Sequence, residues 1–129
     1  MPVTVEWGNE EKTLINQVYT DPWIMEEHYA LVKTTREMIE GVTHEVDVIL
    51  DGRGTKTAPR EILSTINYVN SSEHPRQRFN VIITNSMFLQ GIVKIGGKIS
   101  PKLMENRAVV ETMEEALAKL AELNKVEER

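Results

Sequence analysis

Hydroxyl, carboxylate and basic side chains gather at three places where an apolar run gives way to a helical pattern. These places are residues 51–57, 84–86 and 111–112. Because parallel strands end at one edge of a sheet, these segments would bring helix N-termini together, where free N–H groups favour anions. The candidate anion or ligand residues at this edge are Asp51, Arg53, Lys56, Arg60, Asn85 and Ser86. The alternative interpretation is that these residues only cap helices or face solvent.

The segment 87–95 combines a broad apolar surface with few polar positions. Its candidate interface residues are Met87, Phe88, Leu89, Gly91, Ile92 and Ile95. Only Gln90 and Lys94 are polar, so one sheet face cannot cover the whole helix. We expect the remainder to contact a second copy of the chain, a protein partner or a small apolar ligand. Deeper burial under Ile99 and Leu103 is the alternative.

The other chemistry-bearing residues form no catalytic or metal-binding set. The chain has no Cys, and the spacing of His28, His44 and His74 fits no metal motif. No serine lies in a GxSxG turn, and the glycines of 91–97 do not complete a phosphate-binding loop. We therefore predict no enzymatic activity, no metal and no cofactor, with His28 packed in the core.

Five strands and four helices are expected to position these residues. Alternating or β-branched apolar residues predict strands near 3–7, 13–19, 46–51, 79–84 and 107–111. Helical spacing and capping residues predict helices over 21–41, 59–69, 85–95 and from 112 onward. The order β-β-α-β-α-β-α-β-α is typical of an α/β fold with a mainly parallel five-stranded sheet, right-handed crossovers and helices packed on it.

Length and composition favour a single domain over residues 1–129, with an ordered core of about 3–124. The chain has 129 residues, of which 40% are apolar and 27% charged, and this balance argues against global disorder. It contains no apolar run long enough to span a membrane and does not open with a signal peptide. We therefore expect a cytoplasmic protein.

The net charge of -5 is unevenly distributed along the chain. Residues 1–50 carry 3 basic and 10 acidic side chains, residues 51–107 carry 9 and 4, and residues 108–129 carry 3 and 6. The acidic total argues against nucleic-acid binding, whereas the basic middle can form a local anion-binding surface. Charged faces that merely differ by chance are the simpler alternative.

The order of elements at this length resembles the STAS fold of sulfate transporters and anti-sigma-factor antagonists, the SpoIIAA-like group. The likeness covers roughly 3–124. Four pieces also resemble small stand-alone bacterial proteins of this group: PWIMEE at 22–27, VDVILD at 46–51, NSMFLQ at 85–90 and TMEEAL at 112–117. In antagonist proteins a Ser or Thr that opens the helix after the third strand is phosphorylated, and this switches partner binding. The matching stretch, 51–59, reads DGRGTKTAP. The resemblance thus implies Thr55 or Thr57 as the phospho-acceptor.

Two functions follow as predictions. The first is a non-enzymatic regulatory or protein-interaction domain of STAS-like type, acting through a protein partner, a homodimer or both. The alternative is a small-ligand module for an anionic or apolar molecule. Such a molecule would bind at the helix N-termini of the sheet edge or beside the apolar helix 87–95.

Overall fold

The computed structural model describes residues 2–56, 74–99 and 106–127. Within these ranges the chain forms five strands: β1 (Val3–Trp7), β2 (Leu14–Thr20), β3 (Val46–Gly54), β4 (Gln77–Ile83) and β5 (Arg107–Val110). Three helices accompany them: α1 (Met25–Glu40), α3 (Met87–Ile99) and α4 (Met113–Glu127). The predicted α/β class is therefore confirmed, together with its five strands. The helix expected over 59–69 lies outside the described residues.

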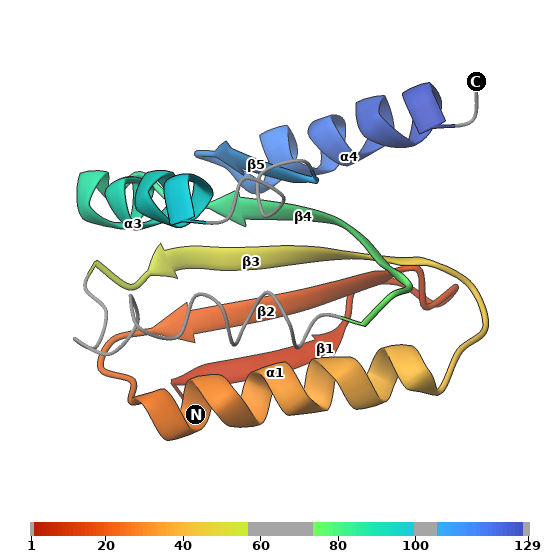
Figure 1. Cartoon of the computed structure of the whole chain (residues 1–129), viewed down its shortest axis with the longest axis horizontal. Helices are drawn as coiled ribbons and strands as arrows, with labels where there is room; N and C mark the ends of the chain where they lie inside the picture. Colours follow the sequence, from red (N-terminus) through yellow and green to blue (C-terminus); the bar gives the residue numbers. More distant parts are fainter. Residues whose placement is uncertain (1, 57–73, 100–105, 128–129) are drawn as a thin grey trace.

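The five strands form one sheet in the order β1-β2-β3-β4-β5, which is also their order along the chain (Figure 1). β1 pairs antiparallel with β2, whereas the pairings of β2 with β3, β3 with β4 and β4 with β5 are parallel. The sheet is therefore mixed, where the sequence predicts a mainly parallel one. The antiparallel member arises because a short turn joins β1 to β2 and folds them as a hairpin.

Different helices cover the two faces of the sheet. α1 and α3 lie on one face, since Leu50 and Ile82 line a cavity together with residues of both helices. α4 lies on the other face, where Ala116 and Leu120 pack against buried residues of β3 and β4. When successive right-handed connections cross the sheet in the same direction, their helices lie on the same face. This rule explains why α1 and α3 share a face. Figure 1 shows α1 along β1 and β2, and α4 beside β4 and β5.

The helix termini differ from the sequence prediction in two places. The Asp21 carboxylate does not cap α1; the helix begins at Met25, and the Ile24 N–H donates to the Glu27 carboxylate over 3.1 Å. α3 does not end at the glycines 96–97 but continues to Ile99. Glycine in a helix interior costs about 1 kcal/mol relative to alanine, a penalty that the packing of an apolar helix can exceed.

A buried carboxylate joins the sheet to α4. Asp47 on β3 accepts hydrogen bonds from the Arg78 guanidinium over 3.2 and 3.3 Å, and from the Phe79 N–H over 3.2 Å. The side-chain amide of Asn124 on α4 donates to the same carboxylate over 3.2 Å. Because these donors come from β4 and from the helix, the charge fixes the position of α4 on its face of the sheet.

Candidate functional site

Side chains from α1, α3 and four strands line a two-part cavity on the sheet face that α1 and α3 cover. One part has polar side chains among apolar ones in its lining and a volume of about 60 Å³. The other is apolar and has a volume of about 150 Å³. Tyr19, His28, Leu50 and Ile82 line both parts and so join them. We call the two parts the polar chamber and the apolar chamber.

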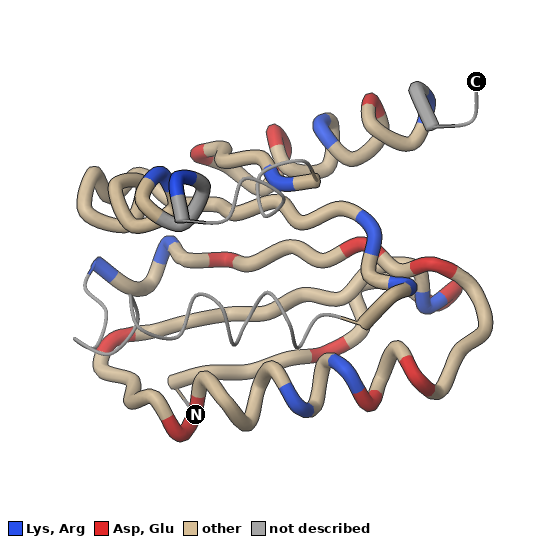
Figure 2. The backbone as a smooth tube through the Cα atoms, in the orientation of Figure 1, with Lys and Arg blue, Asp and Glu red and all other residues tan. Residues whose placement is uncertain are grey.

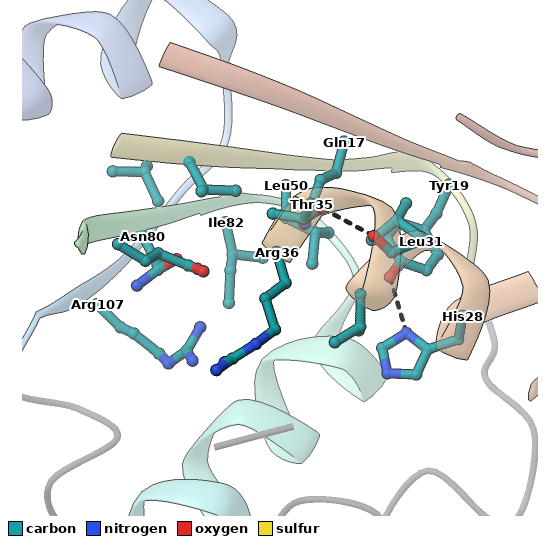
Figure 3. Close-up of a pocket in the computed structure, with 14 residues that line it drawn as sticks. Gln17, Tyr19, His28, Leu31, Thr35, Arg36, Leu50, Asn80, Ile82 and Arg107 are labelled. Atoms are coloured by element: carbon teal, nitrogen blue, oxygen red, sulfur yellow. Dashed lines mark hydrogen bonds between the residues drawn. The ribbon is translucent and has the colours of Figure 1, made fainter. Parts of the chain in front are cut away.

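The polar chamber lies between α1 and strands β2 to β5 (Figure 3). Val48, Asn80 and Arg107 occupy one row of the parallel register, so their side chains leave the sheet on the same face. Arg36 reaches the same space from α1, and in Figure 3 the ends of the Arg36 and Arg107 side chains point toward one another. Both arginines also have interaction partners of their own.

Among the buried atoms of this lining that have no hydrogen-bond partner in the described structure are Nε2 of His28 and Nδ2 of Asn80. Only 7% of His28 and 4% of Asn80 is exposed. The Asn80 Oδ1 accepts a hydrogen bond from Gln77, so the free capacity of this amide is its N–H donors. An unsatisfied buried polar group costs about 1–3 kcal/mol, which is why native proteins normally pair such groups with protein, water or ligand.

The Tyr19 hydroxyl and Nδ1 of His28 form a buried hydrogen bond of 2.8 Å. Burial raises the pKa of the Tyr19 phenol. Burial also lowers the pKa of His28 to about 4, so at neutral pH the phenol keeps its proton and the imidazole is uncharged. When the phenol donates to Nδ1, the imidazole proton lies on Nε2. His28 then presents an N–H donor at the wall that the two chambers have in common.

The apolar chamber lies between α3 and the carboxyl ends of β2, β3 and β4. Leu89, Ile92 and Val93 form its α3 wall. Opposite them the Trp23 and Tyr19 rings meet edge to face, with centroids 4.9 Å apart and an interplanar angle of 71°. The indole Nε1 of Trp23 already donates a hydrogen bond, so this wall presents carbon to the chamber.

Thr55 holds this wall in place and is buried, with 3% of its surface exposed. Its hydroxyl accepts from Trp23 Nε1 over 2.9 Å and donates to the Asp21 carboxylate over 2.6 Å, and the Lys56 N–H donates to the same carboxylate over 2.9 Å. The Thr55 hydrogen bond is the main reason that the pKa of Asp21 is lowered. The suggested phospho-acceptor Thr55 is thus a buried link between β3 and the start of α1. The other suggested acceptor, Thr57, lies outside the described residues.

The residues expected to bind an anion at the sheet edge are only partly brought together. Arg53 donates to both oxygens of Asp51, over 2.9 and 2.7 Å, and this pairing lowers the pKa of Asp51. Gly52, between them, lines the apolar chamber, so the alternation of a strand directs Asp51 and Arg53 to the opposite face. The charge of Arg53 is therefore engaged within β3, away from the cavity.

The remaining edge candidates lie near the start of α3. The Ser86 hydroxyl accepts a hydrogen bond from the Leu89 N–H over 3.3 Å, so it caps α3. The same hydroxyl lies 3.5 Å from the Lys56 carbonyl oxygen and donates to it. Asn85 is exposed, and Arg60 lies outside the described residues. Capping thus accounts for Ser86, as the simpler sequence interpretation has it.

The strand order explains why the cavity lies on a face rather than at the edge. In open α/β sheets, ligands bind at the edge where successive crossovers go to opposite faces and the helices part. Here α1 and α3 lie on the same face, so space opens beneath the helices instead.

The basic residues in the middle of the chain, residues 51–107, do not gather on one surface. In Figure 2 their described Lys and Arg positions fall at the end of β3, at the start of β4, on α3 and at the start of β5.

The apolar residues of α3 divide between two sides. Leu89 and Ile92 line the apolar chamber. The outward residues are Met87, Phe88 and Ile95, which are 86%, 54% and 45% exposed. A Cβ atom built on Gly91 meets nothing within 4 Å, so this position is open as well. The helix therefore has one stripe facing the cavity and another facing outward.

Neither a metal site nor a membrane span is found in the described parts of the chain. No group of three or more His, Asp or Glu side chains there is placed to hold a metal ion. None of the described helices is both long and apolar enough to cross a membrane.

Four residues of the cavity are not predicted from the sequence: Gln17, Arg36, Asn80 and Arg107. Two of them carry a signal that periodicity could have revealed. Asn80 interrupts an apolar strand, and Gln17 takes an inward position of β2 that apolar residues otherwise occupy. A polar side chain at such a position marks either a buried network or a site. Arg36 and Arg107 resemble ordinary surface arginines until the fold places them.

Comparison with protein-family models gives no match. Searches of curated proteins and of solved structures likewise find no significant similarity to this chain.

Proposed function

We propose that this chain is a non-enzymatic domain that binds a small molecule in the two-part cavity. The observation that carries this proposal is the buried, unpartnered His28 Nε2 and Asn80 Nδ2 in the lining of one cavity. The cavity offers buried polar atoms without partners and an apolar wall, which are components of a binding site for a small molecule. The described lining contains no Ser, Cys, Lys, Asp or Glu side chain, and we propose binding without turnover on that ground.

A thermal-shift screen of purified full-length protein against a library of small organic molecules tests this function. A ligand present at one hundred times its dissociation constant stabilises the folded state by about 2.7 kcal/mol, which is easily detected. Ile92→Trp places a large ring in the apolar chamber, whereas Ile95→Trp places the same ring on the exposed side of α3. We expect ligands to stabilise the wild type and Ile95→Trp but not a folded Ile92→Trp. A library that stabilises none of the three, or all three equally, contradicts the proposal.

A second candidate function is a protein-interaction domain of STAS-like type. The outward stripe of α3 supports it, because Met87 and Phe88 leave large apolar side chains in solvent beside the open Gly91. A self-association or partner contact through this stripe is compatible with ligand binding on the inner side of the same helix. Sedimentation of wild-type protein over a range of concentrations tests the homodimer form of this proposal.

A further inference from the structure

We infer that the apolar chamber takes an uncharged aromatic molecule of about one ring. This inference rests on the proposed binding function and specifies its ligand class.

The polar groups around the apolar chamber are engaged with one another. The Thr55 hydroxyl accepts from Nε1 of Trp23 over 2.9 Å and donates to the Asp21 carboxylate over 2.6 Å. The Tyr19 hydroxyl is hydrogen-bonded to Nδ1 of His28 over 2.8 Å. The surface that remains for a ligand is carbon almost throughout. A strongly polar ligand would therefore lose its hydrogen bonds to water without replacing them in this chamber.

The described lining of the apolar chamber offers nothing that would balance a charge. None of these residues is Lys, Arg, Asp or Glu. Burial lowers the pKa of His28 to about 4 and raises the pKa of Tyr19, so both side chains are uncharged at neutral pH. Moving an unpaired charge from water into such surroundings is strongly unfavourable. The chamber therefore selects against carboxylates and amines.

The volume and the walls of the chamber fit one aromatic ring. A cavity of about 150 Å³ with an apolar lining is known to hold benzene, and this chamber has a volume of about 150 Å³. The Tyr19 and Trp23 rings on one wall already meet edge to face, with centroids 4.9 Å apart. A further ring between them and α3 would gain an aromatic contact of the same kind, in addition to the burial of its own surface.

Toluene and benzoate test the exclusion of charge. Both have one ring, and benzoate carries a carboxylate where toluene has a methyl group. The methyl NMR signals of Leu89, Ile92 and Val93 in full-length wild-type protein report entry into the chamber, because an aromatic ring shifts the signals of methyl groups beside it. Ile95, which is 45% exposed, is the control on the same helix. At pH 7 we expect toluene to shift the chamber methyl signals but not those of Ile95, and benzoate at the same concentration to shift neither. Benzoate shifts as large as those of toluene would overturn the inference.

Methylcyclohexane tests the preference for an aromatic ring, because it has nearly the size of toluene without the π-system. Each dissociation constant from the NMR titration is corrected by the partition of that compound between water and hydrocarbon, since methylcyclohexane is the more hydrophobic of the two. After this correction we expect toluene to bind at least about threefold more tightly, a factor typical of an aromatic pair. Equal corrected affinities would overturn the aromatic assignment.

Leu89→Ala tests the size limit. It removes three carbon atoms from the α3 wall of the chamber, and Leu117→Ala makes the same change on α4, where the side chain is 48% exposed. We expect the affinity of naphthalene relative to toluene to rise about tenfold in Leu89→Ala and to stay unchanged in Leu117→Ala, because a misfit of one or two carbon atoms in a hydrophobic pocket changes affinity by a factor of this size. An unchanged ratio in a folded Leu89→Ala would overturn the inference. If Leu89→Ala does not fold, the methyl signals of the wild type decide.

The outcomes separate this inference from the proposed function. If toluene leaves the chamber methyl signals unchanged while another molecule of the library stabilises the protein, the inference is overturned and a cavity ligand of another class remains. If toluene has no effect and the library screen also finds no stabilising molecule, the proposed function fails together with the inference.

Discussion

The buried His28 should make the folding stability of this protein depend on pH between neutrality and pH 4. Burial lowers the pKa of His28 from its ordinary value of 6.5 to about 4 in the folded chain. Between these values the unfolded chain binds a proton at this residue and the folded chain does not, so acid favours unfolding. Each pKa unit corresponds to about 1.4 kcal/mol. His28 alone should therefore lower the free energy of unfolding by about 3 kcal/mol when the pH falls from 7 to 4.

Urea unfolding curves, followed by tryptophan fluorescence at several pH values, measure this effect. His28→Phe removes the titrating group, and combining it with Tyr19→Phe avoids leaving the buried phenol without its partner. Other groups also respond to acid, so the relevant quantity is the difference in unfolding free energy between wild type and variant. We expect that difference to shift by about 3 kcal/mol between pH 7 and 4 in favour of the variant.

His44→Phe is the matched control. His44 is exposed on the loop before β3, and its replacement should leave the wild-type pH dependence in place. Parallel stability curves for wild type and the His28 variant over this pH range would refute the reasoning, because they would mean that the folded protein accommodates a charged His28. Such a result would also remove the basis for assigning a neutral, donating imidazole to the cavity.

Three further changes have definite expected results. Thr55→Val should lower the free energy of unfolding by about 1–3 kcal/mol in urea titrations, because it breaks the link between Trp23 and Asp21; unchanged stability would contradict that role. Asp47→Ala should lower the free energy of unfolding by about 3 kcal/mol, because it removes a buried charge from the donors that surround it. A loss below about 0.5 kcal/mol, which is typical of surface substitutions, would show that the carboxylate does not hold α4 in place. Phe88→Glu should leave the melting temperature nearly unchanged, because the ring is 54% exposed, and should abolish any self-association seen by sedimentation. A wild type that stays monomeric at high micromolar concentration would exclude the homodimer.

Local sequence patterns predict the strands and helices of this fold better than they predict the residues of its cavity. Alternation in β1 and β-branched residues in β3 identify strands because such patterns reflect which faces are buried. The starting point of α1 was harder to predict. Asp21 is a good helix cap by type, but its carboxylate bonds to Thr55, which is 34 residues away in the chain. A contact between residues so far apart leaves no local signal in either segment.

The candidate site shows the same limit more strongly. The sequence predicts ligands at the strand ends, because that is where helix N-termini meet in a typical parallel sheet. The cavity instead uses Asn80 and Arg107, which come together only through the pairing of β4 with β5. His28 was correctly expected in the core, but its unpartnered nitrogen depends on what α1 packs against. Strand register and helix packing thus determine which side chains line the cavity, and the periodicity of the sequence does not reveal either.

The consecutive order of the strands also bears on how this chain can assemble during synthesis. Each strand pairs with the strand that precedes it in the sequence, so the sheet can grow by one strand at a time as the chain leaves the ribosome. The β1–β2 hairpin needs only a short loop to close, and it gives β3 an edge on which to pair. β3 would in turn offer its own unpaired edge until β4 emerges, which makes a partly synthesised chain most open to wrong pairing at its newest strand. A ribosome-bound series truncated after each strand should therefore gain protease resistance in steps, with the N-terminal hairpin protected first.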